Sequence, residues 1–219
     1  MISKHEVVRK KLVKWYDEHG RSFPWRDTND PYRVLISEIL LRRTTATAVC
    51  RVYGDFFERF DSIERLARAR ESTIAQALGS LGLQFRRASE LKQMASFISK
   101  NYSGTIPRIH TDLLSLPGVG PYIASAVRNF AFGDPAPLVD GNVIHLISRV
   151  YGTNFKGPAD SDAWEFMSDL GGNQQEAKLY WGLIDLVATI CLRQNPRCSI
   201  CPLSEVCSYM KGETSVECP

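Results

Sequence analysis

The 219-residue sequence contains no apolar run long enough to span a membrane, and its first residues, Met1 to His5, do not form a signal peptide. It also has no internal repeat, no low-complexity segment and no stretch with the alternating pattern of a β-strand. These absences argue against membrane, secreted and β-sheet proteins. We expect a cytosolic, all-α protein that makes no contact with a membrane.

Charge of either sign is in only small excess, because 27 Lys and Arg residues face 24 Asp and Glu residues and the net charge is +3. This balance permits nucleic-acid binding without requiring it. Hydrophobic residues make up 44% and charged residues 23%, so the composition is that of a folded chain. The length allows one large domain or two smaller lobes with an ample core.

Apolar residues recur at helical spacing along most of the chain. The helical segments predicted from this spacing are 4–18, 87–100, 111–116, 122–132, 139–150, 161–170 and 174–190. Residues 34–52 carry two apolar stripes around the polar segment 42–45. Asp61 and Glu64 predict a capping box for a helix that ends at residue 69, and Ser72 predicts the cap of the next helix.

The segment LPGVGPYIA, residues 116–124, predicts a helix-hairpin-helix. Gly118 and Gly120 flank one apolar residue and permit a tight turn, and Pro121 stands where a new helix can begin. Such a turn presents backbone amides that suit a phosphate. Glycine-rich turns between helices are common and often bind nothing, so the hairpin alone does not decide between a phosphate site and a purely structural turn.

Four cysteines form a C-x6-C-x2-C-x5-C pattern within 17 residues: Cys191, Cys198, Cys201 and Cys207. In a cytosolic protein such thiols stay reduced and suit a metal centre. Zinc accepts four thiolates, but the single C-x2-C pair without a strand pattern favours an iron–sulfur centre over zinc. Cys50, inside a predicted helix, is expected to be a buried small residue, and Cys218 is expected to be free.

Together, the hairpin, Asp140 in the sequence VDGNV and the cysteine spacing resemble the helix-hairpin-helix DNA glycosylase superfamily. They resemble most its iron–sulfur branch, which includes endonuclease III, the adenine-DNA glycosylases and the archaeal thymine/uracil mismatch glycosylases. The resemblance extends from Phe23 to Cys207. It implies a [4Fe–4S] cluster on the four cysteines.

The same resemblance implies two lobes with the active site in the cleft between them. The first is a six-helix barrel that carries the hairpin, residues 28–136. The second is a helical lobe that carries the iron–sulfur loop at 191–207 and is built from residues 1–27 and 137–219.

The resemblance assigns the catalytic carboxylate to Asp140. Cleavage of an N-glycosidic bond passes through an oxocarbenium-like sugar, which a nearby carboxylate stabilises. Asp140 also fits the N-cap of the helix that follows, and one residue can fill both roles. Glu38 matches a glutamate that, in the mismatch glycosylases, acts on the base or positions water. The alternative for Glu38 is a solvated helix face.

Tyr122 stands where the bifunctional relatives carry a lysine that forms a Schiff base with the sugar. A tyrosine has no amine for that step. The resemblance therefore implies a monofunctional enzyme in which water is the nucleophile. Tyr122 would then contact the flipped base, and the alternative is a tyrosine packed at the start of its helix.

Two features of the resemblance concern the base that is removed. Residues 42–45, RRTT, resemble the archaeal thymine mismatch enzymes, and no residues follow the cluster to build the 8-oxoguanine-reading domain of adenine glycosylases. Against this, residues 140–143, DGNV, are closer to the adenine type, and His145 departs from the arginine usual in both. The resemblance favours thymine or uracil opposite guanine over adenine. A bifunctional lyase is disfavoured by Tyr122, and a DNA-binding module without catalysis by the presence of Asp140 and Glu38.

The implied partner is double-stranded DNA with a mismatched or damaged base, bound by a monomer in association with the nucleoid. Phosphate contacts are expected from the amides of Gly118 and Gly120, where a monovalent cation binds in the family, and from Arg193 and Arg197.

Extraction of a base leaves a gap in the stack that the protein must fill. Leu83 matches the residue that fills this gap, with Gln84 beside it. Arg42 is a second candidate to enter the gap, and its alternative is a solvated helical arginine.

Overall fold

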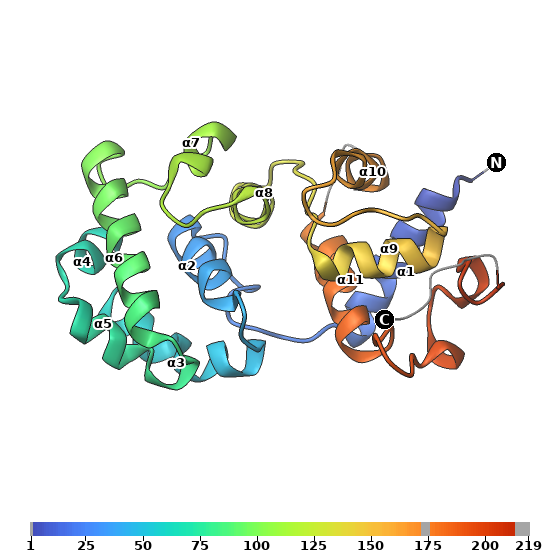
Figure 1. Cartoon of the computed structure of the whole chain (residues 1–219), viewed down its shortest axis with the longest axis horizontal. Coiled ribbons are helices and arrows are strands. Elements are labelled where there is room, and N and C mark those ends of the chain that lie inside the picture. The colour runs from blue at the N-terminus through green and yellow to red at the C-terminus, as the bar shows by residue number, and fades with distance from the viewer. Residues whose placement is uncertain (1, 172–175, 213–219) are drawn as a thin grey trace. The chain divides into compact units, whose positions relative to one another are not determined.

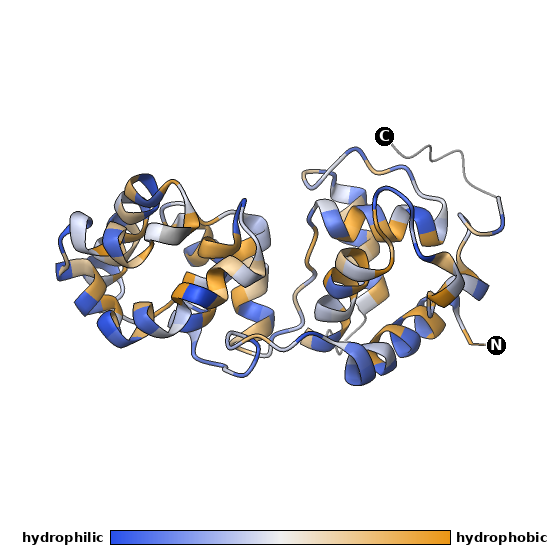
Figure 2. Cartoon of the chain, turned by 90° about the horizontal axis from the view of Figure 1, so that it is seen from below, coloured by the Kyte–Doolittle hydropathy of each residue, from blue (hydrophilic) through white to orange (hydrophobic). Residues whose placement is uncertain are grey.

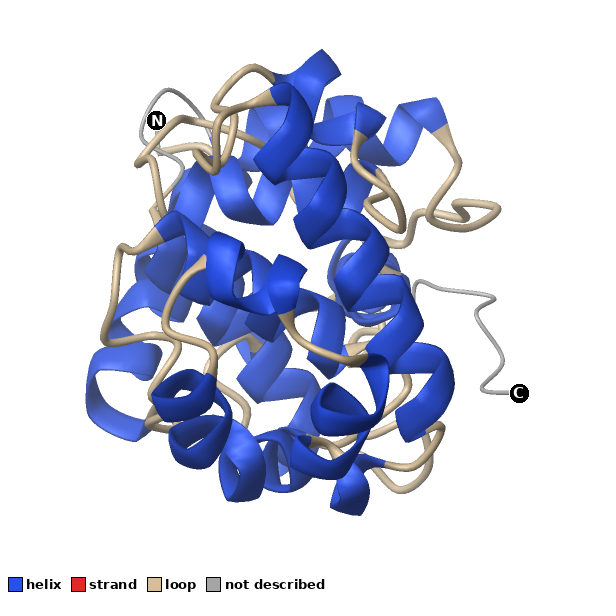
Figure 3. Ribbon diagram, turned by 90° about the vertical axis from the view of Figure 1, so that its left-hand side faces the viewer, coloured by secondary structure: helices blue, strands red, loops and turns tan. Residues whose placement is uncertain are grey.

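The computed structural model describes residues 2–171 and 176–212. In these ranges the chain forms helices and connecting loops without a strand, which confirms the all-α prediction (Figure 3). The chain divides into two compact units. Unit 1 comprises Met1–Arg21 and Gly133–Pro219, and unit 2 comprises Ser22–Phe132. None of the described helices is both long and apolar enough to cross a membrane.

Unit 1 is built on the packing of its first and last helices (Figure 1). Its helices are α1 (Lys4–His19), α9 (Gly141–Tyr151), α10 (Ser161–Gly171) and α11 (Ala177–Thr189). A Cβ at Gly182 of α11 would lie 3.1 Å from the Leu12 carbonyl oxygen of α1, so glycine permits this close approach. Arg21 lies two residues after α1, and its guanidinium forms a salt bridge to the fully buried Asp185 of α11, with an Nη2–Oδ1 distance of 2.7 Å.

Unit 2 has one hydrophobic core that extends in sequence from Phe23 to Val127. Its helices are α2 (Pro31–Leu41), α3 (Ala46–Arg59), α4 (Ile63–Arg68), α5 (Glu71–Ala77), α6 (Gln84–Asn101), α7 (His110–Ser115) and α8 (Pro121–Phe130), with a short 3₁₀ turn η1 (Gly79–Leu81) before α6. Colouring by hydropathy shows the apolar stripes that these helices carry (Figure 2). Helix α2 is buried along the whole run 34–40, so it forms the centre of this core.

Two helix starts differ from the sequence prediction. Ser62, not Asp61, caps α4, because its Oγ accepts the backbone N–H of Arg65 at 3.3 Å. Asp61 instead pairs with the Arg65 side chain. Helix α5 begins one residue before Ser72 and has no side-chain cap. Adjacent polar residues offer competing caps, and local sequence does not decide between them.

The remaining helix predictions agree within a few residues. The two apolar stripes in 34–52 belong to separate helices, and Thr45 caps the second of them through an Oγ1 that accepts the Ala48 N–H at 3.2 Å. Cys50 lies in α3 and is half-buried against the unit 2 core. Residues 174–175 of the predicted last helix and Cys218 lie outside the described ranges.

The helix-hairpin-helix forms as predicted. Helix α7 ends at Ser115, Gly118 has a positive φ of 79°, and Pro121 occupies the first turn of α8. A side chain at Gly118 would have to adopt the left-handed backbone region. The turn therefore requires this glycine for its conformation.

We expect Gly118→Ala to destabilise unit 2 by ~1–2 kcal/mol, because alanine disfavours a left-handed conformation by that amount. Its matched control is Gly54→Ala. Gly54 lies in the middle of α3 with no atom within 4 Å of an added Cβ, so alanine there should stabilise by roughly 0.5–1 kcal/mol. Urea unfolding of both variants measures this difference. Equal stability of the two would show that the hairpin does not depend on the left-handed glycine.

Candidate functional site

Asp140 caps helix α9 of unit 1, as the sequence predicts. Its Oδ1 accepts the backbone N–H groups of Asn142 at 2.9 Å and Val143 at 2.8 Å. Its Oδ2 accepts the side-chain amide of Asn142 at 3.2 Å. The buried residues Leu138 and Val139 precede it and fix the approach of the chain. The carboxylate is thus held in one orientation at the N-terminus of a helix, which favours negative charge.

Burial nevertheless raises the pKa of Asp140 above its ordinary value, although the hydrogen bonds from Val143 and Asn142 and the charge of Arg193 oppose the shift. Since the folded-state pKa is raised, Asp140 stabilises the fold below the pKa of an unfolded aspartate. This contribution is lost as the pH rises through the folded-state pKa. At neutral pH the ionised form costs stability, which is typical of a group kept for its charge rather than for folding.

The loop after α11 lies against α9. The guanidinium of Arg193 donates to the Gly141 carbonyl at 3.2 Å, next to Asp140. Further along α9, the Nε2 atom of His145 lies 2.9 Å from the carbonyl oxygen of Cys191. Residues 191–193 therefore contact α9 near its first turn and again near its middle.

Arg149 makes the third contact between α9 and this loop, and the sequence analysis did not find it. The residue is 2% exposed. Its guanidinium donates to the Leu192 carbonyl at 2.8 Å, the Arg193 carbonyl at 3.0 Å and the Cys191 sulfur at 3.5 Å. The available signal was an arginine placed between the apolar residues Leu146, Ile147 and Val150 of the same helix. Its positive charge favours a thiolate at Cys191.

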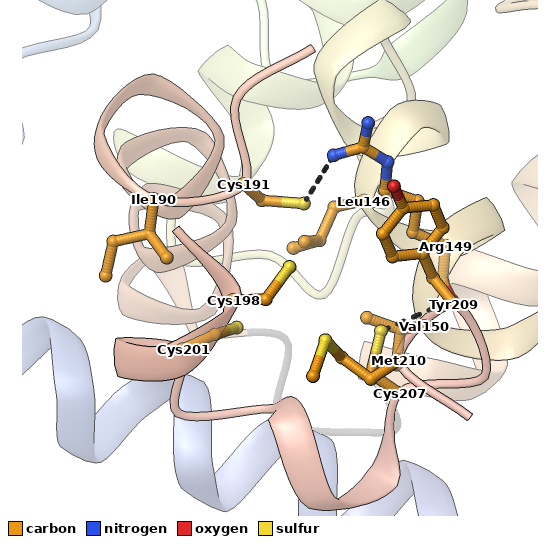
Figure 4. Close-up of a pocket in the computed structure, with 10 residues that line it drawn as sticks. All are labelled: Leu146, Arg149, Val150, Ile190, Cys191, Cys198, Cys201, Cys207, Tyr209 and Met210. Carbon is orange, nitrogen blue, oxygen red and sulfur yellow. Dashed lines mark hydrogen bonds between the residues drawn. The ribbon is translucent and has the colours of Figure 1, made fainter. Parts of the chain in front are cut away.

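The four predicted cysteines surround one hollow of ≈ 330 Å³, part of which opens to solvent (Figure 4). Its other walls include the apolar side chains of Leu146, Val150 and Ile190. In the described ranges, no three or more His, Cys, Asp or Glu side chains are arranged to hold a single metal ion. Four sulfurs around an apolar hollow are the donor set of an iron–sulfur cluster, so these residues fit the group.

Burial also disfavours the ionised form of three of the four thiols. It raises the pKa of Cys191 and Cys198, and it raises the pKa of Cys201 to about 11 with the neighbouring cysteines adding to the shift. Without iron these groups are thiols at neutral pH. Binding of the cluster must therefore release their protons, so the free energy of binding becomes more favourable as the pH rises.

Unit 2 holds the other predicted catalytic residues. Glu38 is only 8% exposed and lies within the buried run of α2, so it is not on a solvated helix face. Tyr122 is half-buried in the first turn of α8 and packs against the unit 2 core.

Arg42 is engaged inside unit 2. It donates to the Gly118 carbonyl of the hairpin at 3.2 Å and forms a salt bridge to Glu90 of α6 at 2.7 Å. It is therefore not the solvated helical arginine of the alternative interpretation. Entry of this side chain into a DNA gap would require these bonds to break.

Leu83 and Gln84 open helix α6. Leu83 is 62% exposed and adopts a left-handed conformation with φ of 51°, which is uncommon for a residue with a side chain. Gln84 is the first helical residue and is half-buried. In unit 1, Arg193 and Arg197 are exposed on the cysteine loop, and Gly118 and Gly120 form the hairpin turn of unit 2.

Arg87 of α6 is a second buried arginine that the sequence analysis missed. It is 7% exposed, and it donates to the carbonyls of Gly82 at 3.2 Å, Leu40 at 3.2 Å and Arg42 at 2.7 Å. The signal was its spacing, since position 87 continues the apolar stripe of 91, 94 and 98. It connects the turn before Leu83 to the C-terminus of α2.

Two family models match this chain. The HhH-GPD superfamily of base excision DNA repair proteins matches residues 36–167, and the iron–sulfur binding domain of endonuclease III matches residues 191–207. Similar proteins include the thymine-DNA glycosylase of Aeropyrum pernix, 38% identical over 95% of this chain and 96% of that protein. The thymine/uracil-DNA glycosylase of Methanothermobacter thermautotrophicus is 38% identical over 94% of each. A solved structure of a thermostable thymine-DNA glycosylase has a TM-score of 0.91 and 36% identity over 95% of this chain and 97% of that one.

The chain therefore belongs to the helix-hairpin-helix superfamily of base excision DNA repair proteins. The resemblance drawn from the hairpin, Asp140 and the cysteines is confirmed. The protein is an enzyme of the DNA glycosylase class, which hydrolyses N-glycosyl bonds in damaged or mismatched DNA. The expected [4Fe–4S] cluster is supported by the iron–sulfur domain, whose match begins at Cys191 and ends at Cys207.

We expect the purified protein to contain iron and sulfide in equal amounts and to absorb visible light. Cys198→Ser should lower the iron content and loosen residues 191–207, because the binding energy of the cluster is also folding energy for the loop. Cys50→Ser, a thiol of similar exposure outside the cluster, is the matched control and should keep full iron. Stoichiometric zinc without iron in anaerobically purified protein would contradict the assignment.

Proposed function

We propose that this chain is a monofunctional DNA glycosylase that removes thymine or uracil mispaired with guanine. The observation that carries the proposal is the carboxylate of Asp140, held by two backbone amides against the cost of its burial. A fold that keeps such a group at the first turn of a helix can place fixed negative charge beside a sugar that becomes cationic.

In this mechanism Asp140 acts on the sugar. Its Oδ1 is committed to the helix N-terminus, and its Oδ2 has only the weaker bond from Asn142. We expect this fixed carboxylate to stabilise the cationic sugar without any need for its side chain to reorient. The raised pKa leaves less of the ionised form as the pH falls, so the rate should fall with it.

Glu38 and Tyr122 act on the base and on water in the same proposal. Glu38, which is only 8% exposed, acts in this proposal either as the proton donor to the departing base or as the group that positions the attacking water. Tyr122 forms one wall for the extruded base. Since a tyrosine offers no amine, water attacks the sugar and the strand stays intact.

Removal of thymine or uracil is favoured by the names of two similar proteins, a thymine-DNA glycosylase and a thymine/uracil-DNA glycosylase, each 38% identical to this chain. The sequence DGNV at 140–143 favours adenine as the second candidate. The proposed substrate is duplex DNA, with the hairpin amides of Gly118 and Gly120 and the exposed Arg193 and Arg197 at its phosphates. The enzyme acts as a monomer and is located with the chromosomal DNA.

We expect Asp140→Asn to reduce single-turnover base release by about 10²–10³-fold, the effect of losing a principal electrostatic stabiliser. Asparagine is an equally good helix cap, and removal of the buried charge should leave the thermal stability at neutral pH unchanged or higher. Asp162→Asn, an exposed aspartate in the first turn of α10, should change neither quantity. A near-normal rate in Asp140→Asn would show that Asp140 serves only as a helix cap.

We expect borohydride to trap no covalent complex between the protein and DNA, and strands to break only after alkali. Tyr122→Lys should gain some trapping because it restores an amine, whereas Tyr122→Phe should not. Efficient trapping by the unaltered protein would show a bifunctional enzyme.

Base preference follows from single-turnover release on four duplexes that carry T·G, U·G, A·G or A·8-oxoguanine. We expect T·G and U·G to react faster than either adenine duplex. The opposite order would assign the chain to adenine removal and overturn the proposed specificity.

A further inference from the structure

Phe85 is the most exposed of the large apolar side chains in the described ranges, at 72%, and Leu83, two positions before it, is 62% exposed. Single exposed apolar residues need no explanation. Two of them within three positions are different, because they place more exposed apolar surface at the start of α6 than one residue does. We call Leu83 and Phe85 the 83–85 prong.

The position of Phe85 on its helix is not set by packing. The buried face of α6 consists of Arg87, Ala88, Leu91, Met94, Ala95 and Ile98. Phe85 lies outside this face and is absent from the residues that pack against the unit 2 core. Its ring therefore does not pack in the core, and a smaller residue at this position would not remove core contacts.

The prong is rigid. Leu83 is held in the left-handed region, and its carbonyl accepts the backbone N–H of Arg87 at 3.0 Å. The buried guanidinium of Arg87 binds the Gly82 carbonyl on one side and the carbonyls that end α2 on the other. Binding a ligand at the prong would thus require little ordering of the backbone, which lowers its entropic cost.

The charges around the prong suit a nucleic acid. The side chain of Arg86, between Phe85 and Arg87, is 76% exposed and is anchored at Nε by Glu90 at 2.9 Å. An exposed aromatic ring with a fixed guanidinium beside it matches a base next to a phosphate. A lipid surface or a protein groove would not require the cation.

We infer that Phe85 is a second DNA-stacking residue, and that its ring stacks on the unpaired base opposite the extracted nucleotide while Leu83 fills the gap. The inference rests on the proposed function. Each base presents a π-face to an aromatic ring, so such stacking tolerates different bases and favours the large purine that guanine supplies. An apolar residue inserted beside it keeps the opened step apart. Phe85 is accordingly a residue that recognises the mispaired partner.

The test uses the full protein with its cluster and a duplex that carries a tetrahydrofuran abasic analogue opposite guanine. Phe85→Ala should weaken binding to this duplex about tenfold, as loss of one stacked aromatic does, and leave binding to the fully paired duplex unchanged. Phe85→Trp should restore it. Ile2→Ala, a matched removal of an apolar side chain that is 62% exposed in unit 1, should have no effect. Thermal unfolding confirms that each variant is folded.

A second readout replaces the opposite guanine with the fluorescent base 2-aminopurine. The unaltered protein should quench this base by stacking, and Phe85→Ala should leave it brighter. Equal affinity and equal fluorescence in Phe85→Ala would overturn the inference, as would an equal loss on the paired duplex. Because neither readout needs base release, a protein that releases no thymine would refute the proposed function without affecting this test.

Discussion

Helix α9 carries the carboxylate of Asp140 at its first turn and the loop 191–193 along its length. The loop contacts the helix through Arg193 at Gly141, through His145 and through the buried Arg149. The same loop supplies the first cysteine of the iron–sulfur centre. The cluster and the carboxylate are therefore supported by one helix, and a loop that came loose would release the contacts beside Asp140.

In unit 2, two other arginines connect segments that are far apart in sequence, as Arg149 does in unit 1. Arg42 joins the hairpin to α6, and Arg87 joins the turn before Leu83 to the end of α2. A buried guanidinium costs stability unless its donors are bonded, and Arg87 donates to carbonyls from both segments. The hydrogen bonds of these two arginines hold the hairpin and the 83–85 prong in place. The groups proposed to contact DNA are therefore ordered before the DNA binds.

Local patterns were enough to predict the hairpin, the Asp140 cap and the cysteine cluster, because each depends on residues close in sequence. The two buried arginines could not be assigned in this way. The carbonyl partners of Arg149 lie on residues 192 and 193, and those of Arg87 include residues 40 and 42, so the fold alone brings them together. The cap at Ser62 was missed for the opposite reason, since Asp61 is an equally good local candidate. No sequence pattern marks Phe85 as an exposed residue, because its exposure is known only once the fold is known.

The iron–sulfur loop holds α9 in place and thereby positions the carboxylate of Asp140. Site-resolved amide hydrogen exchange of Asn142 and Val143, whose N–H groups bind Asp140, tests it in protein with and without its cluster. We expect removal of the cluster to accelerate hydrogen exchange at both amides. The amides in the buried middle of α2 in unit 2 should stay protected from exchange. Unchanged protection of Asn142 and Val143 after complete loss of iron would contradict it.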